Sequence, residues 1–106
     1  WISLEIDNLK KVLAELPTAR VGYVTYEDIS ETTIDKAIAI KTDINDVFID
    51  AVYYKLTQSL AEYTLLNDLT LEVWTLNDST QVEGLVEKGV SGITTDTLNI
   101  AEILMD

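Results

Sequence analysis

The chain has 106 residues, of which nineteen are acidic, seven are basic and none is histidine or cysteine, so its formal net charge is −12. The acidic residues are spread along the whole chain, which argues against nucleic acid or an anionic membrane as a partner, because both require a basic surface. No apolar run approaches the ~18 residues that a membrane-spanning helix needs, and the absence of cysteine excludes disulfides and thiolate chemistry.

The length predicts one domain, residues 1–106, without a linker rich in Pro, Gly or Ser. The first predicted element is a helix that Pro17 ends. Its apolar stripe has the i, i+3, i+4, i+7 spacing of a buried helix face: Leu9, Val12, Leu13 and Leu16. Residues 20–25 follow as a predicted strand, since they are mostly apolar and β-branched or aromatic.

The middle of the chain repeats this alternation. A helix is expected within residues 26–42, with Thr32 or Thr33 as its N-cap. Residues 46–54 read as a strand that is continuously apolar except for Asp50, as expected for a strand covered on both faces. Residues 57–68 then predict a helix, whose apolar side is formed by Leu56, Leu60, Tyr63 and Leu66 or Asn67.

The last third contains a strand, a helix and a second strand in close succession. Residues 71–76 predict the first strand, and Asp78 with Gln81 has the spacing of a capping box for a helix over residues 79–88. Gly89 suits the left-handed position that ends a helix, and residues 90–95 predict the next strand. So short a connection implies a right-handed crossover between parallel strands. A final helix is expected over residues 99–106.

Strands and helices therefore alternate along the chain, with four strands in total. Such alternation implies a parallel sheet with helices packed on it, an α/β fold. The pattern alone fits two architectures equally well, part of a β/α barrel and a doubly wound flavodoxin-like sheet.

Two segments of the last third carry a family resemblance: VWTLND, and after one helix KGVSGITTD. They resemble the closing segment of the glycerophosphodiester phosphodiesterase family, whose pattern is roughly vxWTvN, a helix, then GvdGIiTD. The chain departs from that pattern at Ser91 and at Thr97-Leu98. The resemblance favours the barrel and implies the C-terminal (β/α)4 half of a TIM-type (β/α)8 barrel, with Ser3 at the mouth of strand four and residues 20–25 as strand five.

The resemblance also implies a function that this chain does not hold alone. A complete barrel needs about 250 residues, so the chain is expected to be a fragment of the parent domain. In the family, hydrolysis of a glycerophosphodiester to glycerol phosphate and an alcohol uses two histidines and a divalent cation, Mg²⁺ or Ca²⁺, held by carboxylates. Those residues lie in HRG, ExD, HD and LExK motifs. HRG, HD and LExK do not occur here, and no histidine accompanies the one E-x-D string, Glu5-Ile6-Asp7. We therefore expect no catalytic residue and no metal ligand in this chain.

Three residues match family positions at the rim of the substrate pocket: Trp74, Asn77 and Asp96. Each also has a purely structural interpretation, Trp74 as a core aromatic, Asn77 as a turn or cap residue and Asp96 as the N-cap of the last helix. Strand periodicity places Glu72, Trp74 and Leu76 on one face. If that face is the barrel interior, Glu72 must find a basic partner or solvent, because a buried unpaired carboxylate is costly.

The leading interpretation is thus a half barrel that supplies scaffold and pocket wall and is inactive by itself. The alternative is a non-enzymatic protein-interaction module built on a small acidic α/β domain. In either case the inner face of the sheet would expose an apolar surface larger than monomers usually tolerate. We expect either a homodimer or the missing N-terminal half barrel to cover it.

Overall fold

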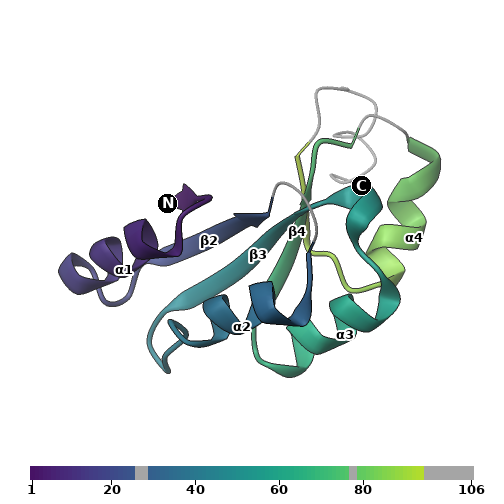
Figure 1. Cartoon of the computed structure of the whole chain (residues 1–106). Helices are drawn as coiled ribbons and strands as arrows, with labels where there is room; N and C mark the ends of the chain where they lie inside the picture. Colours follow the sequence, from purple (N-terminus) through teal and green to yellow (C-terminus); the bar gives the residue numbers. More distant parts are fainter. Residues whose placement is uncertain (26–28, 77–78, 95–106) are drawn as a thin grey trace.

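The computed structural model describes residues 1–25, 29–76 and 79–94 of the chain. Within these ranges, parallel strands alternate with helices (Figure 1). The elements are β1 (Ile2–Ser3), α1 (Ile6–Glu15), β2 (Arg20–Thr25), α2 (Glu31–Ile38), β3 (Asp46–Val52), the 3₁₀ turn η1 (Tyr53–Lys55), α3 (Gln58–Leu66), β4 (Thr70–Trp74), the 3₁₀ turn η2 (Ser79–Gln81), α4 (Val82–Glu87) and β5 (Gly92–Ile93). The α/β class predicted from the sequence is confirmed.

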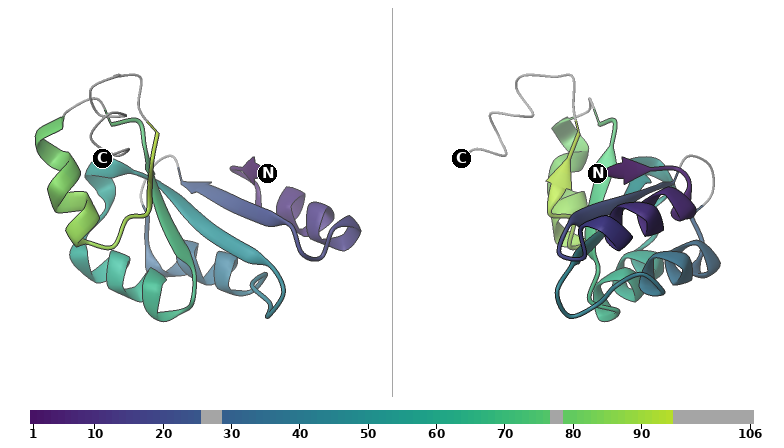
Figure 2. Two further views of the ribbon diagram at one scale, coloured as in Figure 1. Left: turned by 180° about the vertical axis from the view of Figure 1, so that it is seen from behind. Right: turned by 90° about the vertical axis from the view of Figure 1, so that its left-hand side faces the viewer.

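The order of the strands separates the two architectures that the sequence left open. The strands lie in the sheet in chain order, β1-β2-β3-β4-β5, and every neighbouring pair is parallel. A doubly wound sheet reverses its strand order at a switch point, which puts helices on both faces. Here each crossover advances in the same direction, so the helices gather on one face, as in a β/α barrel. The sheet is open, with β1 and β5 at its edges (Figure 2).

One strand was missed in the sequence. The prediction of four strands is wrong because Ile2 and Ser3 form β1, which pairs with Gly22 and Tyr23 of β2. Two residues are too few to show strand periodicity, so only the tertiary pairing reveals the element. Its position agrees with the resemblance, which placed Ser3 at the mouth of a barrel strand.

The two faces of the sheet have different surroundings. Alternate residues of the central strands pack against the helices and form the hydrophobic core, including Val21 and Tyr23 of β2, Val47, Ile49 and Ala51 of β3, and Leu71 and Val73 of β4. Leu9 of α1, Ile34 of α2, Ala61 of α3 and Leu85 of α4 meet them from the helix side. The residues between them point to the opposite face, which we call the inner face. Among the described residues no helix covers the inner face (Figures 1 and 2).

The helices begin and end close to the predicted positions, with local corrections. The predicted caps of α2 are wrong, because Ser30 is the N-cap and its Oγ accepts the Thr33 N–H at 3.3 Å. In α3 the cap is Thr57, whose Oγ1 accepts the Leu60 N–H at 3.2 Å. A hydroxyl in this position satisfies an N–H that has no partner within the helix.

Two leucines assigned to buried helix faces are exposed. Leu16 is 47% exposed because α1 ends at Glu15 and the backbone leaves the helical path there. Leu66 is 84% exposed, since Ala61 and Thr64 occupy the buried side of α3. Thr64 tolerates burial because its hydroxyl donates to the Leu60 carbonyl oxygen at 2.8 Å.

The C-terminal β-α-β unit is present as predicted. β4 and β5 are parallel neighbours, and α4 lies between them in the chain. Gly89 follows α4 with φ of 97°, a left-handed conformation that favours glycine. Asp78 of the predicted capping box, and the helix expected over residues 99–106, lie outside the described residues.

Candidate functional site

A pocket opens on the inner face, at the end of the sheet where the strands finish. Its volume is about 350 Å³. The lining residues come from four strands and the segments that follow them: Ile2, Leu4, Val24, Asp50, Trp74, Thr75 and Thr94. The carboxyl ends of parallel strands are where β/α barrels build their active sites. This is therefore the candidate site.

Trp74 lies in the pocket wall. It is the last residue of β4 and stands beside Val52 of β3. Its indole Nε1–H donates to the backbone carbonyl oxygen of Asp50 at 3.2 Å, which fixes the side chain along the inner face. The helix-packed core does not include Trp74, so the interpretation of this residue as a core aromatic does not hold for that core.

The expected alternation does not continue beyond Trp74. Leu76 was assigned to the face of Trp74, but it is fully buried in the helix-packed core. Thr75, which the same periodicity would place on the opposite face, lines the pocket together with Trp74. The reason is that β4 ends at Trp74, and side chains alternate only while the backbone stays extended.

The other two predicted pocket residues cannot be placed. Asn77 and Asp96 both lie outside the described residues. Thr94, which the sequence analysis did not select, lines the pocket from the segment after β5. Its backbone N–H donates to the Val73 carbonyl oxygen at 2.9 Å, and its own carbonyl accepts the Leu76 N–H at 2.9 Å. These bonds tie the segment to β4 and hold Thr94 at the rim.

Asp50 is the second residue that sequence reasoning missed. It is 8% exposed, and its Oδ1 is buried without a hydrogen-bond partner among the described residues. Burial, with a smaller contribution from the nearby Glu72 carboxylate, raises the pKa of Asp50 to about 6. The signal in the sequence was one acidic residue inside an otherwise apolar strand.

Below the pocket, Glu72 has the basic partner that the sequence analysis required. The Arg20 guanidinium forms an ion pair with Glu72 and donates from Nε to Asp46 Oδ2 at 2.8 Å. Its central carbon also stands 4.1 Å from the centre of the Phe48 ring. One arginine therefore pairs with two carboxylates, which leaves one negative charge in excess, and it stacks on an aromatic face.

Glycines make room for these large side chains. A Cβ on Gly22 would lie 2.1 Å from the Phe48 ring, and a Cβ on Gly92 would lie 2.7 Å from Cγ of Glu72. Phe48 and Glu72 each lie directly over the glycine of a neighbouring strand. The second glycine of the KGVSGITTD motif thus has a packing role in this structure.

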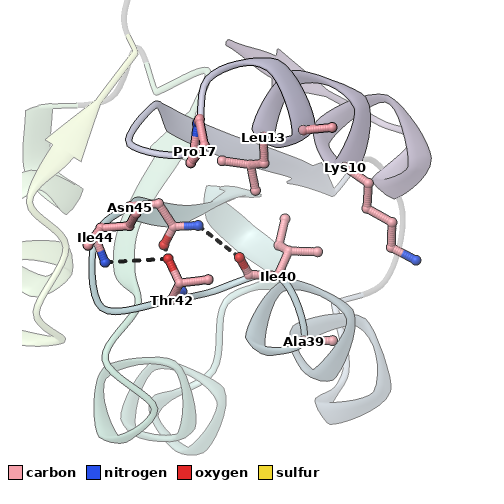
Figure 3. Close-up of a pocket in the computed structure, with 9 residues that line it drawn as sticks. Lys10, Leu13, Pro17, Ala39, Ile40, Thr42, Ile44 and Asn45 are labelled. Carbon is pink, nitrogen blue, oxygen red and sulfur yellow. Dashed lines mark hydrogen bonds between the residues drawn. The ribbon is translucent and has the colours of Figure 1, made fainter.

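A second pocket, of about 370 Å³, lies at the other end of the sheet, between α1 and the loop that precedes β3 (Figure 3). Its polar contacts are internal to that loop: Asn45 Nδ2 donates to the Ile40 carbonyl oxygen at 2.8 Å, and the Ile44 N–H donates to Thr42 Oγ1 at 3.4 Å. Among the described residues that line this pocket, Lys10 alone has a charged side chain. The lining offers no pair of groups for acid–base chemistry.

Residues 1–25, 29–76 and 79–94 contain no group of three His, Cys, Asp or Glu side chains that would hold a metal ion. No helix in these ranges combines the length and apolar character needed to cross a bilayer.

The fold belongs to the α/β class, with parallel strands in chain order as in a β/α barrel and with an open sheet. No family model matches the chain, and no curated protein matches its sequence. Two solved structures, however, are similar to the chain. A crystal structure of a protein from Silicibacter pomeroyi DSS-3, provisionally assigned as a glycerophosphoryl diester phosphodiesterase, superposes with a TM-score of 0.78 at 18% identity. The match covers 99% of this chain and 37% of that one.

A glycerophosphodiester phosphodiesterase from Parabacteroides distasonis ATCC 8503 superposes with a TM-score of 0.71 at 26% identity. Here the match covers 98% of this chain and 42% of that one. The resemblance to this family, first indicated by two sequence motifs, is confirmed at the level of structure. The chain spans less than half the length of either protein.

Proposed function

We propose that the chain is the C-terminal half of a glycerophosphodiester phosphodiesterase-like barrel, and that it supplies scaffold and one wall of the substrate pocket. The observation that carries this proposal is the open sheet of five parallel strands in chain order, with a pocket at the carboxyl ends of the strands. The two similar phosphodiesterases, each more than twice as long as the match, support the same assignment.

In this proposal the hydrolytic step belongs to the rest of the barrel. The chain contains no histidine, and its described residues include no metal-binding group of three side chains. The divalent cation that the family resemblance implies therefore does not fit the residues described, and we derive no step through it. These residues shape the pocket, because Trp74, Thr75 and Thr94 all line it.

The test is an activity measurement on the isolated 106-residue protein. With Mg²⁺ or Ca²⁺ and a glycerophosphodiester substrate, we expect release of glycerol phosphate at the background rate. Metal-dependent release of glycerol phosphate by the pure protein would contradict the proposal that hydrolysis requires residues outside this chain. In a longer protein that carries the whole barrel, Trp74→Phe should keep most of the buried volume yet slow turnover. Unchanged turnover with a lower melting temperature would assign Trp74 to stability alone.

A second candidate function, a protein-interaction module, is favoured by the exposed apolar residues beside the open edge. Trp1, Ile2 and Leu4 are 64%, 61% and 55% exposed, and two of them line the inner-face pocket. A second copy of the chain could cover this surface as a homodimer, which would bring together ten of the described strands. Light scattering at micromolar concentration and moderate salt checks this. A dimer supports the module, and a well-folded monomer contradicts self-association.

A further inference from the structure

The inner face carries a charge excess that its own residues leave uncompensated. Among the described strands it presents three carboxylates, those of Asp46, Asp50 and Glu72, and one base, Arg20. Arg20 is already bound to Asp46 and Glu72. Asp50 is therefore the acidic group of this face for which the described residues supply no base.

The buried position of Asp50 makes the lack of a base costly in free energy once another polypeptide covers the inner face. The residue is more than nine-tenths buried, its Oδ1 has no hydrogen-bond donor among the described residues, and it lines the pocket. The pocket walls beside it are apolar, formed by Ile2, Leu4 and Val24. Covering such a carboxylate with an apolar surface would remove its remaining hydration, and a buried charge persists only when it is paired and hydrogen-bonded.

We propose that Asp50 is the anchor for a lysine or arginine side chain supplied by the polypeptide that covers the inner face. The inference rests on the proposed half barrel, and it specifies the chemistry of the missing part. An ammonium or guanidinium group would give Oδ1 a charge-assisted hydrogen bond, and its aliphatic stem would pack on the apolar walls of the pocket. A second copy of this chain suits the site less well, because its inner face carries the same excess of carboxylates.

The carboxylate of Asp50 requires a partner that donates a hydrogen bond as well as one that carries a positive charge. A primary ammonium or a guanidinium can hydrogen-bond to Oδ1, whereas a quaternary ammonium carries no N–H. The site should therefore discriminate between a lysine side chain and its trimethylated form. An apolar side chain of similar length, such as norleucine, would fill the pocket but leave the carboxylate unpaired.

The experiment is a titration followed by NMR on the Trp74 indole N–H and on the backbone amides of β3. The probes are acetyl-Val-Lys-Val-amide, its norleucine analogue and its trimethyllysine analogue, with n-butylammonium as a probe that lacks a backbone. We expect the lysine peptide to bind about tenfold tighter than the norleucine peptide, as one charge-assisted hydrogen bond implies. Asp50→Asn and Asp50→Ser should abolish that difference. Glu87→Gln, which removes an exposed charge on α4, should preserve it.

Three results would overturn the proposal. Equal binding of the lysine and norleucine peptides would make the pocket merely apolar. Equal binding by wild type and Asp50→Asn would attribute the effect to the overall negative charge. Binding of n-butylammonium without binding of the lysine peptide would make this a site for small molecules. None of these results depends on hydrolysis, so failure here and failure of the proposed function can be told apart.

Discussion

Asp50 also gives the sharpest test of the fold, because its ionisation is coupled to folding. The perturbation is Asp50→Asn, which keeps the shape of the side chain and removes the charge. Burial, with a smaller contribution from Glu72, raises the pKa of Asp50 from 3.8 to about 6 in the folded chain. Arg20 also lies on this face, but it is engaged with Glu72 and Asp46.

The sign of the effect follows from proton binding. Between pH 3.8 and about 6 the folded protein holds a proton on Asp50 that the unfolded chain has released. The contribution of protonated Asp50 to the free energy of unfolding is therefore fully present below pH 3.8 and is lost as the pH rises through 6. A shift of roughly two pKa units corresponds to at most about 3 kcal/mol. The Asp50→Asn protein does not lose this stability, since it cannot ionise there.

The assay is urea denaturation of both proteins at several pH values between 4 and 8, followed by tryptophan fluorescence. We expect equal free energies of unfolding near pH 4, and Asp50→Asn to be more stable by up to about 3 kcal/mol at pH 7.5. Comparison of the two proteins at each pH isolates the effect of Asp50, because every other acidic residue is present in both. Glu87→Gln should differ from wild type by less than about 0.5 kcal/mol throughout. A difference between Asp50→Asn and wild type that does not change with pH would refute the reasoning.

Two further substitutions test the packing of the sheet and the start of a helix. Gly22→Ala should lower the free energy of unfolding by about 1–3 kcal/mol, because its methyl group would collide with the Phe48 ring. Gly84→Ala is the matched control: its Cβ meets nothing within 4 Å, so the better helix former should stabilise by up to about 1 kcal/mol. If urea denaturation gave equal changes in the free energy of unfolding for the two substitutions, the close contact between Gly22 and the Phe48 ring would be contradicted. Ser30→Ala should cost about 1 kcal/mol by removing the N-cap of α2, whereas Thr32→Ala should cost less; the reverse order would contradict the assigned cap.

Local sequence was sufficient for most elements of the chain. Strand β2 begins and ends at the residues predicted, 20 and 25, because a short β-branched and aromatic run between helix signals has few alternatives. The β4-α4-β5 unit followed from the same kind of signal, with Gly89 at the end of the helix. The pairing requirement for Glu72 was also predictable, since it depends only on strand periodicity and the cost of burying a charge.

Only the tertiary structure determines the order of the strands, the partners of charged side chains and the burial of Asp50. Chain-order pairing of the strands excludes a doubly wound sheet, although both architectures have the same alternation of elements. The partner of Glu72 is Arg20, 52 residues away in sequence, and β1 exists only because β2 offers it an edge. In the sequence, Asp50 is one acidic residue inside an apolar strand. Whether its side chain packs against the helices or lies on the inner face depends on which face of the sheet the helices cover. A helix or a strand is set by neighbours in sequence, but the burial and charge of a side chain are set by groups that the fold brings from elsewhere.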